Sequence, residues 1–150
     1  MPRERISWDE YFIRLCELSA ERSKDPNTRV GAVVVTDDNV ILGVGYNGFP
    51  RGCDDENFSW EREGSFLETK YAYICHAEEN AIYNSQNSVK GGKIYCNVFP
   101  CNECAKTIIQ CGIKEVIYSK DTKYFNEDCY IAARNMFNAA GVTFRHAVYE

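Results

Sequence analysis

From residue 77 onwards, the sequence alternates three times between a helical segment and a strand segment. Predicted helices at 77–84, 101–111 and 127–139 are each followed by a predicted strand, at 93–98, 113–119 and 142–148. Gly112 and Gly141 lie where glycine commonly ends a helix. Strands that are joined through helices commonly pair in parallel, so this part of the chain predicts βαβ units.

The N-terminal part of the chain predicts a helix, an antiparallel hairpin and a long loop. Ser7 and Glu10 have the spacing of a capping box, and Asp-Pro-Asn at 25–27 ends the helix that follows. A β-branched run, a short turn and a second strand-like run then indicate a hairpin, before a stretch rich in Gly, Pro, Asp and Asn. The predicted bounds are 8–23 for the helix, 30–36 and 40–46 for the strands, and 47–70 for the loop.

These elements predict an α/β fold in a single domain that spans residues 1–150. The expected architecture has three layers, α/β/α, in which helices cover both faces of a five-stranded mixed sheet. Hydrophobic residues make up 45% of the chain, which excludes a disordered protein. The charged N-terminus and the lack of a long apolar run predict a soluble, cytoplasmic protein with no membrane association.

The chain has eight cysteines and two histidines. In a reducing compartment disulfides are not expected, so each cysteine is either a buried apolar residue or a metal ligand. We expect four of them to pack in the core: Cys16, Cys96, Cys111 and Cys129. His146 is interpreted as structural. Cys53 and Cys75 flank the long loop and could meet in space, but no histidine in the loop completes a second metal site, so we expect one zinc ion per chain.

Four residues in two clusters carry the strongest functional signal. His76 and Glu78 open one predicted helix, while Cys101 and Cys104 share one face in the first turn of another. A helix N-terminus favours thiolates, and three protein ligands leave the fourth tetrahedral position of a zinc ion open to water. We therefore predict a catalytic zinc ion held by His76, Cys101 and Cys104, with Glu78 as the carboxylate that transfers protons.

The Cys-x-x-Cys pair has other interpretations. A structural zinc site would need a second pair at similar spacing, which the remaining cysteines do not provide, and a redox pair would not need His76 and Glu78. His-x-Glu combined with Pro-Cys-x-x-Cys is the signature of zinc-dependent nucleobase deaminases. A non-catalytic zinc-binding module is the alternative from a different functional class, and it would need a fourth protein ligand.

Five stretches extend this pattern beyond the zinc signature. They are SKDPNTRVGA at 23–32, GYNGFPRGC at 45–53, HAEENAI at 76–82, FPCNECAK at 99–106 and AGVTFR at 140–145. With these stretches, the chain resembles the deoxycytidylate (dCMP) deaminases of the cytidine deaminase-like zinc superfamily over nearly its whole length. The resemblance implies the hydrolysis of dCMP to dUMP and ammonia, which supplies dUMP for thymidylate synthesis.

The resemblance also implies contacts to the substrate. Glu78 would protonate the cytosine ring and help the amino group leave, Asn47 would face the sugar, and Tyr124 would close over the substrate. Contacts to the base are implied for Val30, Ala32 and Ala77, and contacts to the 5′-phosphate for Gly48, Phe49, Pro50 and Arg51. An ordinary solvated surface charge is the alternative interpretation of Arg51.

Regulation by nucleotides is a further implication of the resemblance. The family is commonly hexameric, so we expect a homohexamer that dCTP with Mg²⁺ activates and dTTP inhibits. The expected allosteric contacts lie at the end of the first helix and in the first hairpin: Lys24, Asn27, Arg29, Gly31, Gly45 and Tyr46.

The zinc residues alone would also suit deaminases of other cytosine or adenine substrates. A deaminase of tRNA or single-stranded DNA would need a basic groove, and the net charge of −5 disfavours it, so no stable nucleic-acid partner is expected. A deaminase of cytosine or cytidine would lack phosphate recognition.

Overall fold

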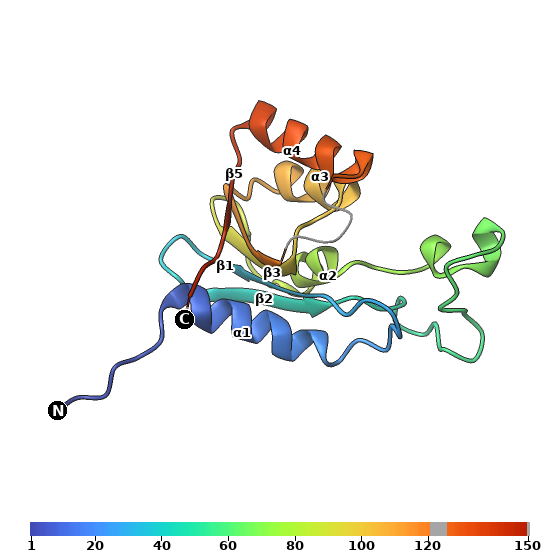
Figure 1. Cartoon of the computed structure of the whole chain (residues 1–150), viewed down its shortest axis with the longest axis horizontal. Coiled ribbons are helices and arrows are strands. Elements are labelled where there is room, and N and C mark those ends of the chain that lie inside the picture. Colours follow the sequence, from blue (N-terminus) through green and yellow to red (C-terminus); the bar gives the residue numbers. More distant parts are fainter. Residues whose placement is uncertain (121–125, 150) are drawn as a thin grey trace.

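The computed structural model describes residues 1–120 and 126–149 (Figure 1). Its helices are α1 (Trp8–Ala20), α2 (Ala77–Asn84), α3 (Asn102–Gln110) and α4 (Asp128–Ala140). Its strands are β1 (Gly31–Val35), β2 (Ile41–Tyr46), β3 (Lys93–Val98), β4 (Glu115–Lys120) and β5 (Thr143–His146). Within the described residues, no helix combines the length and the apolar character needed to cross a lipid bilayer.

The strands form one mixed sheet in the order β2-β1-β3-β4-β5. The hairpin strands β1 and β2 are antiparallel, and β1 also pairs antiparallel with β3. The pairs β3–β4 and β4–β5 are parallel, because a helix crosses over between the two strands of each pair. The predicted five-stranded mixed sheet is confirmed.

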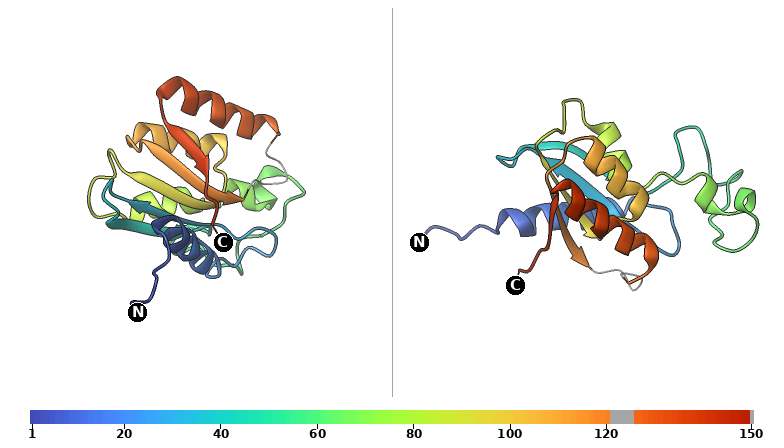
Figure 2. Two further views of the ribbon diagram at one scale, coloured as in Figure 1. Left: turned by 60° about the vertical axis from the view of Figure 1, so that its left-hand side comes forward. Right: turned by 90° about the horizontal axis from the view of Figure 1, so that it is seen from above.

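Helices cover both faces of the sheet, as predicted (Figure 2). On one face, Phe12 and Cys16 of α1 pack with Val33 of β1 in one apolar cluster. On the other face, α2, α3 and α4 contribute to a second cluster that includes Ala81 and Phe137. Two separate cores therefore enclose the sheet in a three-layer α/β/α arrangement.

Two glycines let helices approach the sheet closely. A Cβ atom at Gly31 would lie 1.9 Å from the carbonyl oxygen of Cys16 in α1, and one at Gly45 would lie 2.3 Å from the backbone nitrogen of Ala81 in α2. Any larger residue would therefore push a helix away from the sheet. At Gly45 this contact matters for function, because α2 follows directly on His76.

The predicted element bounds hold to within a few residues, with three corrections. The first helix ends at Ala20 rather than 23, because Glu21 and Arg22 donate backbone hydrogen bonds three residues back and tighten the chain into a turn. The last strand covers Thr143–His146 rather than 142–148. The end of the predicted loop at 47–70 forms short 3-10 helices at Phe66–Glu68 and Lys70–Ala72.

The segment between β2 and α2 projects to one side of the sheet (Figure 1). It has aromatic contacts of its own: the ring centroids of Phe49 and Trp60 lie 4.3 Å apart, and those of Phe58 and Tyr73 lie 4.9 Å apart. Gly48 and Cys75 exchange backbone hydrogen bonds and close the base of the segment next to His76. The segment is therefore packed locally and tied to the domain at its root.

Candidate active site

Two helix N-termini carry the predicted metal ligands. His76 is the N-cap residue of α2, and Cys101 is the N-cap residue of α3, where β3 has just ended. Cys104 lies in the first turn of α3, on the same side as Cys101. The Glu79 carboxylate accepts a hydrogen bond from the backbone of His76, which fixes the residue that begins α2.

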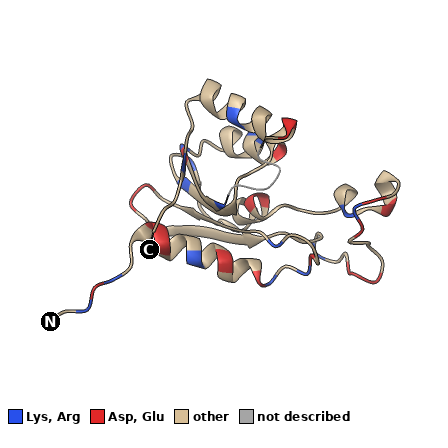
Figure 3. Cartoon of the chain, viewed as in Figure 1, with Lys and Arg blue, Asp and Glu red and all other residues tan. Residues whose placement is uncertain are grey.

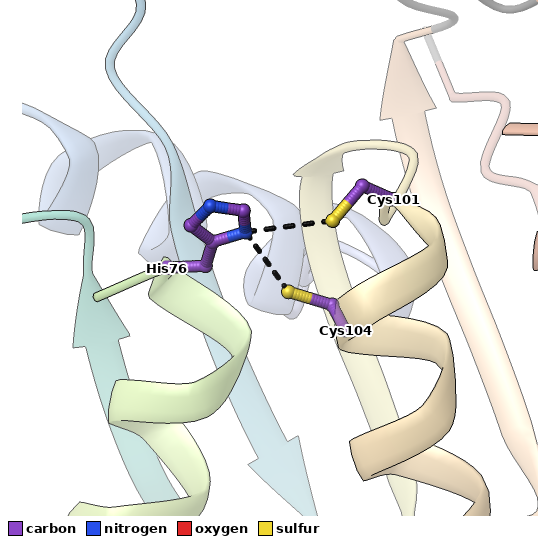
Figure 4. A group of neighbouring side chains, drawn as sticks. All are labelled: His76, Cys101 and Cys104. Atoms are coloured by element: carbon purple, nitrogen blue, oxygen red, sulfur yellow. Dashed lines mark hydrogen bonds between the residues drawn. The ribbon is translucent and has the colours of Figure 1, made fainter. Parts of the chain in front are cut away.

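The three ligand atoms converge at one point (Figure 4). His76 Nδ1 lies 3.2 Å from Cys104 Sγ and 3.5 Å from Cys101 Sγ. Tetrahedral zinc bound to nitrogen and sulfur separates such atoms by about 3.6 Å. One imidazole and two thiolates at these distances fit a zinc ion. Among the described residues, these three side chains form the group that could hold a metal ion. Cys53 and Cys75 do not belong to it.

The protonation of the ligands also fits metal binding. A hydrogen bond from Cys104 lowers the pKa of Cys101 to about 4, with help from His76 and against the effect of burial. The hydrogen bond between the two cysteines raises the pKa of Cys104. The hydrogen bond between His76 and Cys101 raises the pKa of His76 to about 9. Cys101 is therefore a thiolate at neutral pH, and a metal that binds both sulfurs displaces protons from His76 and Cys104.

Glu78 lies beside these ligands and is only 4% exposed. Its Oε2 atom accepts a hydrogen bond of 3.1 Å from Cys104 Sγ. Burial raises the pKa of the Glu78 carboxyl group, and the nearby His76 opposes that shift. A carboxyl group with a raised pKa beside a metal centre is suited to taking and returning a proton near neutral pH.

A pocket of about 410 Å³ is lined by two of the candidate metal ligands, His76 and Cys101. Val30, Asn47 and Ala77, for which the resemblance implies contacts to the substrate, line this pocket together with His76, Glu78 and Cys101. Its size and mixed apolar and polar lining are typical of small-molecule sites.

Other predicted substrate residues lie outside the pocket lining. Ala32 is fully buried in the core, Gly48 pairs with Cys75, and Phe49 stacks on Trp60. Pro50 is exposed, and Arg51 donates a hydrogen bond to Asn84. Tyr124 falls outside the described residues.

Several pocket residues are not among those predicted from the sequence: Asp25, Thr28, Arg62, Lys70, Tyr71, Ile74, Val98, Phe99, Glu127, Cys129 and Tyr130. Asp25 lies within the SKDPNTRVGA stretch, which could have indicated a role beyond ending a helix. The prediction that Cys129 packs in the core is wrong, because α4 presents it half-buried in the pocket wall. Cys16 and Cys96 are fully buried as predicted, and Cys111 packs against the core half-buried.

A polar network builds one wall of the pocket. Asp25 Oδ1 accepts hydrogen bonds from the backbone of Asn27 and Thr28, while Asp25 Oδ2 pairs with Lys70 Nζ. The Asn47 side chain accepts from the Val30 backbone and donates to the carbonyl of Thr28. Asn47 is thereby held in place, so its position in the pocket is set before any ligand binds.

Of the residues predicted for allosteric contacts, three lie in the turn between α1 and β1, Gly31 begins β1, and Gly45 and Tyr46 end β2. Lys24, Asn27 and Arg29 are exposed, and Lys24 forms a 3.0 Å ion pair with Asp55. The Tyr46 ring lies 5.7 Å from the guanidinium of Arg22. Gly31 and Gly45 are buried against helices. His146, predicted to be structural, contacts the carbonyl of Ser119.

Comparisons with known proteins agree on one family. Residues 6–120 match the family profile described as the cytidine and deoxycytidylate deaminase zinc-binding region. The chain is 56% identical over 142 residues to human deoxycytidylate deaminase, covering 93% of this chain and 79% of that protein.

Solved structures of dCMP deaminase from the cyanophage S-TIM5 share the fold. The apo form superposes with a TM-score of 0.71 at 26% identity, covering 96% of this chain and all of that one. The complex with dCMP and dUMP has a TM-score of 0.74 at 24% identity, covering 97% of this chain and all of that one. The cytidine deaminase-like fold expected from the sequence is therefore confirmed.

Proposed function

Because this chain belongs to the cytidine and deoxycytidylate deaminase family, we propose that it hydrolyses dCMP to dUMP and ammonia. The observation that carries the proposal is the convergence of His76, Cys101 and Cys104 beside the buried Glu78, where His76, Glu78 and Cys101 line a pocket. The 56% identity to human deoxycytidylate deaminase supports dCMP as the substrate.

Each residue has a definable task in this reaction. His76, Cys101 and Cys104 hold a zinc ion, which when bound supplies the Lewis acidity that activates a water molecule for attack on carbon 4 of cytosine. Glu78 takes a proton from that water and delivers it to ring nitrogen 3. After attack, Glu78 takes the second water proton and passes it to the amino group, which leaves as ammonia. Val30, Asn47 and Ala77 bind the substrate in the pocket.

The direct test is a substrate panel with the zinc-loaded protein. Candidate substrates are dCMP, CMP, deoxycytidine, dCTP and a cytosine-containing oligonucleotide, and deamination is followed by the ultraviolet change of the ring. We expect dCMP to be the preferred substrate. Preference for the oligonucleotide would instead indicate a nucleic-acid deaminase, which the interspersed acidic and basic residues disfavour (Figure 3).

We further propose that the enzyme is a cytoplasmic homohexamer that supplies dUMP for thymidylate synthesis, activated by dCTP with Mg²⁺ and inhibited by dTTP. Lys24, Asn27 and Arg29 are exposed together after α1, where a triphosphate could contact them. Steady-state kinetics at low dCMP, with and without dCTP and Mg²⁺, test the regulation. A hyperbolic curve that dCTP leaves unchanged would contradict it, and light scattering measures the oligomeric state.

A further inference from the structure

Apart from the metal ligand His76, the pocket contains two cationic side chains among its described lining residues, Arg62 and Lys70. Both come from the segment that projects between β2 and α2, not from the helices that carry the metal ligands. A nucleotide whose base lies at the metal must place its phosphate elsewhere in the pocket. These two cations are therefore the first candidates to receive it.

Lys70 is already committed to another anion. Its Nζ atom lies 2.5 Å from Asp25 Oδ2, and the side chains are 8% and 0% exposed. Drawing Lys70 towards a phosphate would leave the Asp25 carboxylate buried without its partner, at a high cost. Lys70 thus has a structural partner that a ligand would have to displace.

Arg62 is in the opposite situation. It is exposed, and within the described part of the chain its guanidinium has no hydrogen bond or ion pair. An exposed residue that also lines a pocket lies at its mouth. Arginine offers a planar set of donors that matches a phosphate group through two parallel hydrogen bonds.

The backbone next to Arg62 is anchored although its side chain is unpaired. The carbonyl of Glu61 accepts a 2.9 Å hydrogen bond from the backbone of Lys70, the residue that is clamped to Asp25. Trp60, two residues before Arg62 in the sequence, packs on Phe49. These contacts hold Arg62 at the pocket, so less ordering is needed when a ligand arrives.

We propose that Arg62 binds the 5′-phosphate of the substrate and is the residue that makes the enzyme prefer a nucleotide to a nucleoside. Lys70 and Asp25 act as positioning residues that keep Arg62 at the pocket. The inference rests on the proposed function. It replaces Arg51 as the phosphate ligand, since Arg51 lies outside the pocket lining and donates to Asn84.

The test compares Arg62→Ala with Arg51→Ala on dCMP and on deoxycytidine, with kcat/KM as the measured quantity. Loss of hydrogen bonds to a charged group should lower kcat/KM of Arg62→Ala for dCMP by about 10- to 100-fold. Its kcat/KM for deoxycytidine should not change, because that substrate has no phosphate. Arg51→Ala should match the wild type on both substrates.

Binding of the product gives a readout that does not depend on turnover. Calorimetry should show that Arg62→Ala binds dUMP more weakly than the wild type, while deoxyuridine binds both proteins equally. Arg62→Lys should recover part of the dUMP affinity, because it restores the charge without the paired hydrogen bonds.

Each contrary result overturns the inference. Equal losses on dCMP and deoxycytidine in Arg62→Ala would mean that Arg62 only supports the fold of the segment. If Arg62→Ala still preferred dCMP to deoxycytidine as strongly as the wild type, Arg62 would not bind the phosphate. If Arg51→Ala lost that preference, Arg51 would be the phosphate ligand instead. Failure of the proposed function looks different, because a zinc-loaded wild-type protein would then not deaminate dCMP at all.

Discussion

Lys70 and Asp25 form an ion pair with 2.5 Å between Nζ and Oδ2, although both side chains are almost completely buried. They lie 45 residues apart in the sequence, and the pair joins the turn after α1 to the projecting segment. Asp25 also holds the turn that carries Thr28, which accepts from Asn47. The pair is therefore where the pocket wall and the segment that bears Arg62 are joined.

Replacement of Lys70 by methionine should lower the free energy of unfolding by about 3–5 kcal/mol, because the Asp25 carboxylate then stays buried without a partner. Denaturant titration measures the loss. The matched control is Lys24→Met, whose ion pair with Asp55 is exposed and should contribute less than about 1 kcal/mol. Adding Asp25→Asn to Lys70→Met should recover part of the stability. If the single variant is as stable as the control, the pair does not fasten the segment.

Glu78→Gln should keep the zinc ion and lose activity. Glutamine has nearly the same shape, so His76, Cys101 and Cys104 still bind the metal, but the amide cannot accept and return a proton. The expected loss in kcat is about 100- to 10,000-fold, the usual contribution of a general acid–base group. Ammonia release and zinc content per chain are measured together.

The control for this variant is Glu103→Gln. Glu103 lies in α3, the helix that also carries Cys104. Glu103 is exposed and pairs with Lys106, so its replacement should leave both zinc and turnover unchanged. Normal turnover by Glu78→Gln would remove Glu78 from the mechanism and favour a different proton carrier.

The group of three candidate metal ligands could be predicted from the sequence because it depends on local spacing. Cys101 and Cys104 are three residues apart, and a helix puts such residues on one face whatever the rest of the fold does. The sheet was equally predictable, since the alternation of helix and strand leaves few possible topologies. In both cases, neighbours in the sequence carry the necessary information.

The rest of the pocket could not be predicted in this way. Arg62 and Lys70 lie in a segment without periodicity, so nothing local shows which of its side chains lines the pocket. Their roles differ because Asp25, far away in the sequence, neutralises only one of them. Cys129 was likewise indistinguishable from a core cysteine, because its place in the pocket depends on how α4 packs beside α3.

Arg145 of β5 should contribute stability that disappears in acid. It donates hydrogen bonds of 2.7 and 3.0 Å to the two carboxylate oxygens of Asp9 in α1, and this contact lowers the pKa of Asp9 below its usual 3.8. A carboxyl group with a lowered pKa in the folded state stabilises the protein at pH values above its unfolded pKa. That stability is lost as the pH falls through the folded pKa.

Arg145→Met should therefore be less stable than the wild type by up to about 1 kcal/mol at pH 7, since the pair is partly exposed. The difference should shrink steadily below about pH 4, the usual pKa of an aspartate. Denaturant titrations at a series of pH values measure it, with Lys106→Met, which breaks the exposed pair with Glu103, as the comparison. A difference that stays constant down to pH 2 would mean that Arg145 acts through packing rather than through its charge.

Gly45→Ala should weaken both the fold and the metal centre. The added methyl group would lie 2.3 Å from the backbone nitrogen of Ala81 and 2.6 Å from the carbonyl oxygen of Ala77, so α2 must move. Overpacking of this kind costs about 1–3 kcal/mol, and the shift also displaces His76 and Glu78 at the start of the helix. Thermal unfolding and competition for zinc with a chelator measure the two effects.

Gly48→Ala is the matched control, because nothing lies within 4 Å of its added methyl group. Normal zinc affinity in Gly45→Ala would show that the metal centre does not depend on the close packing of α2 against β2.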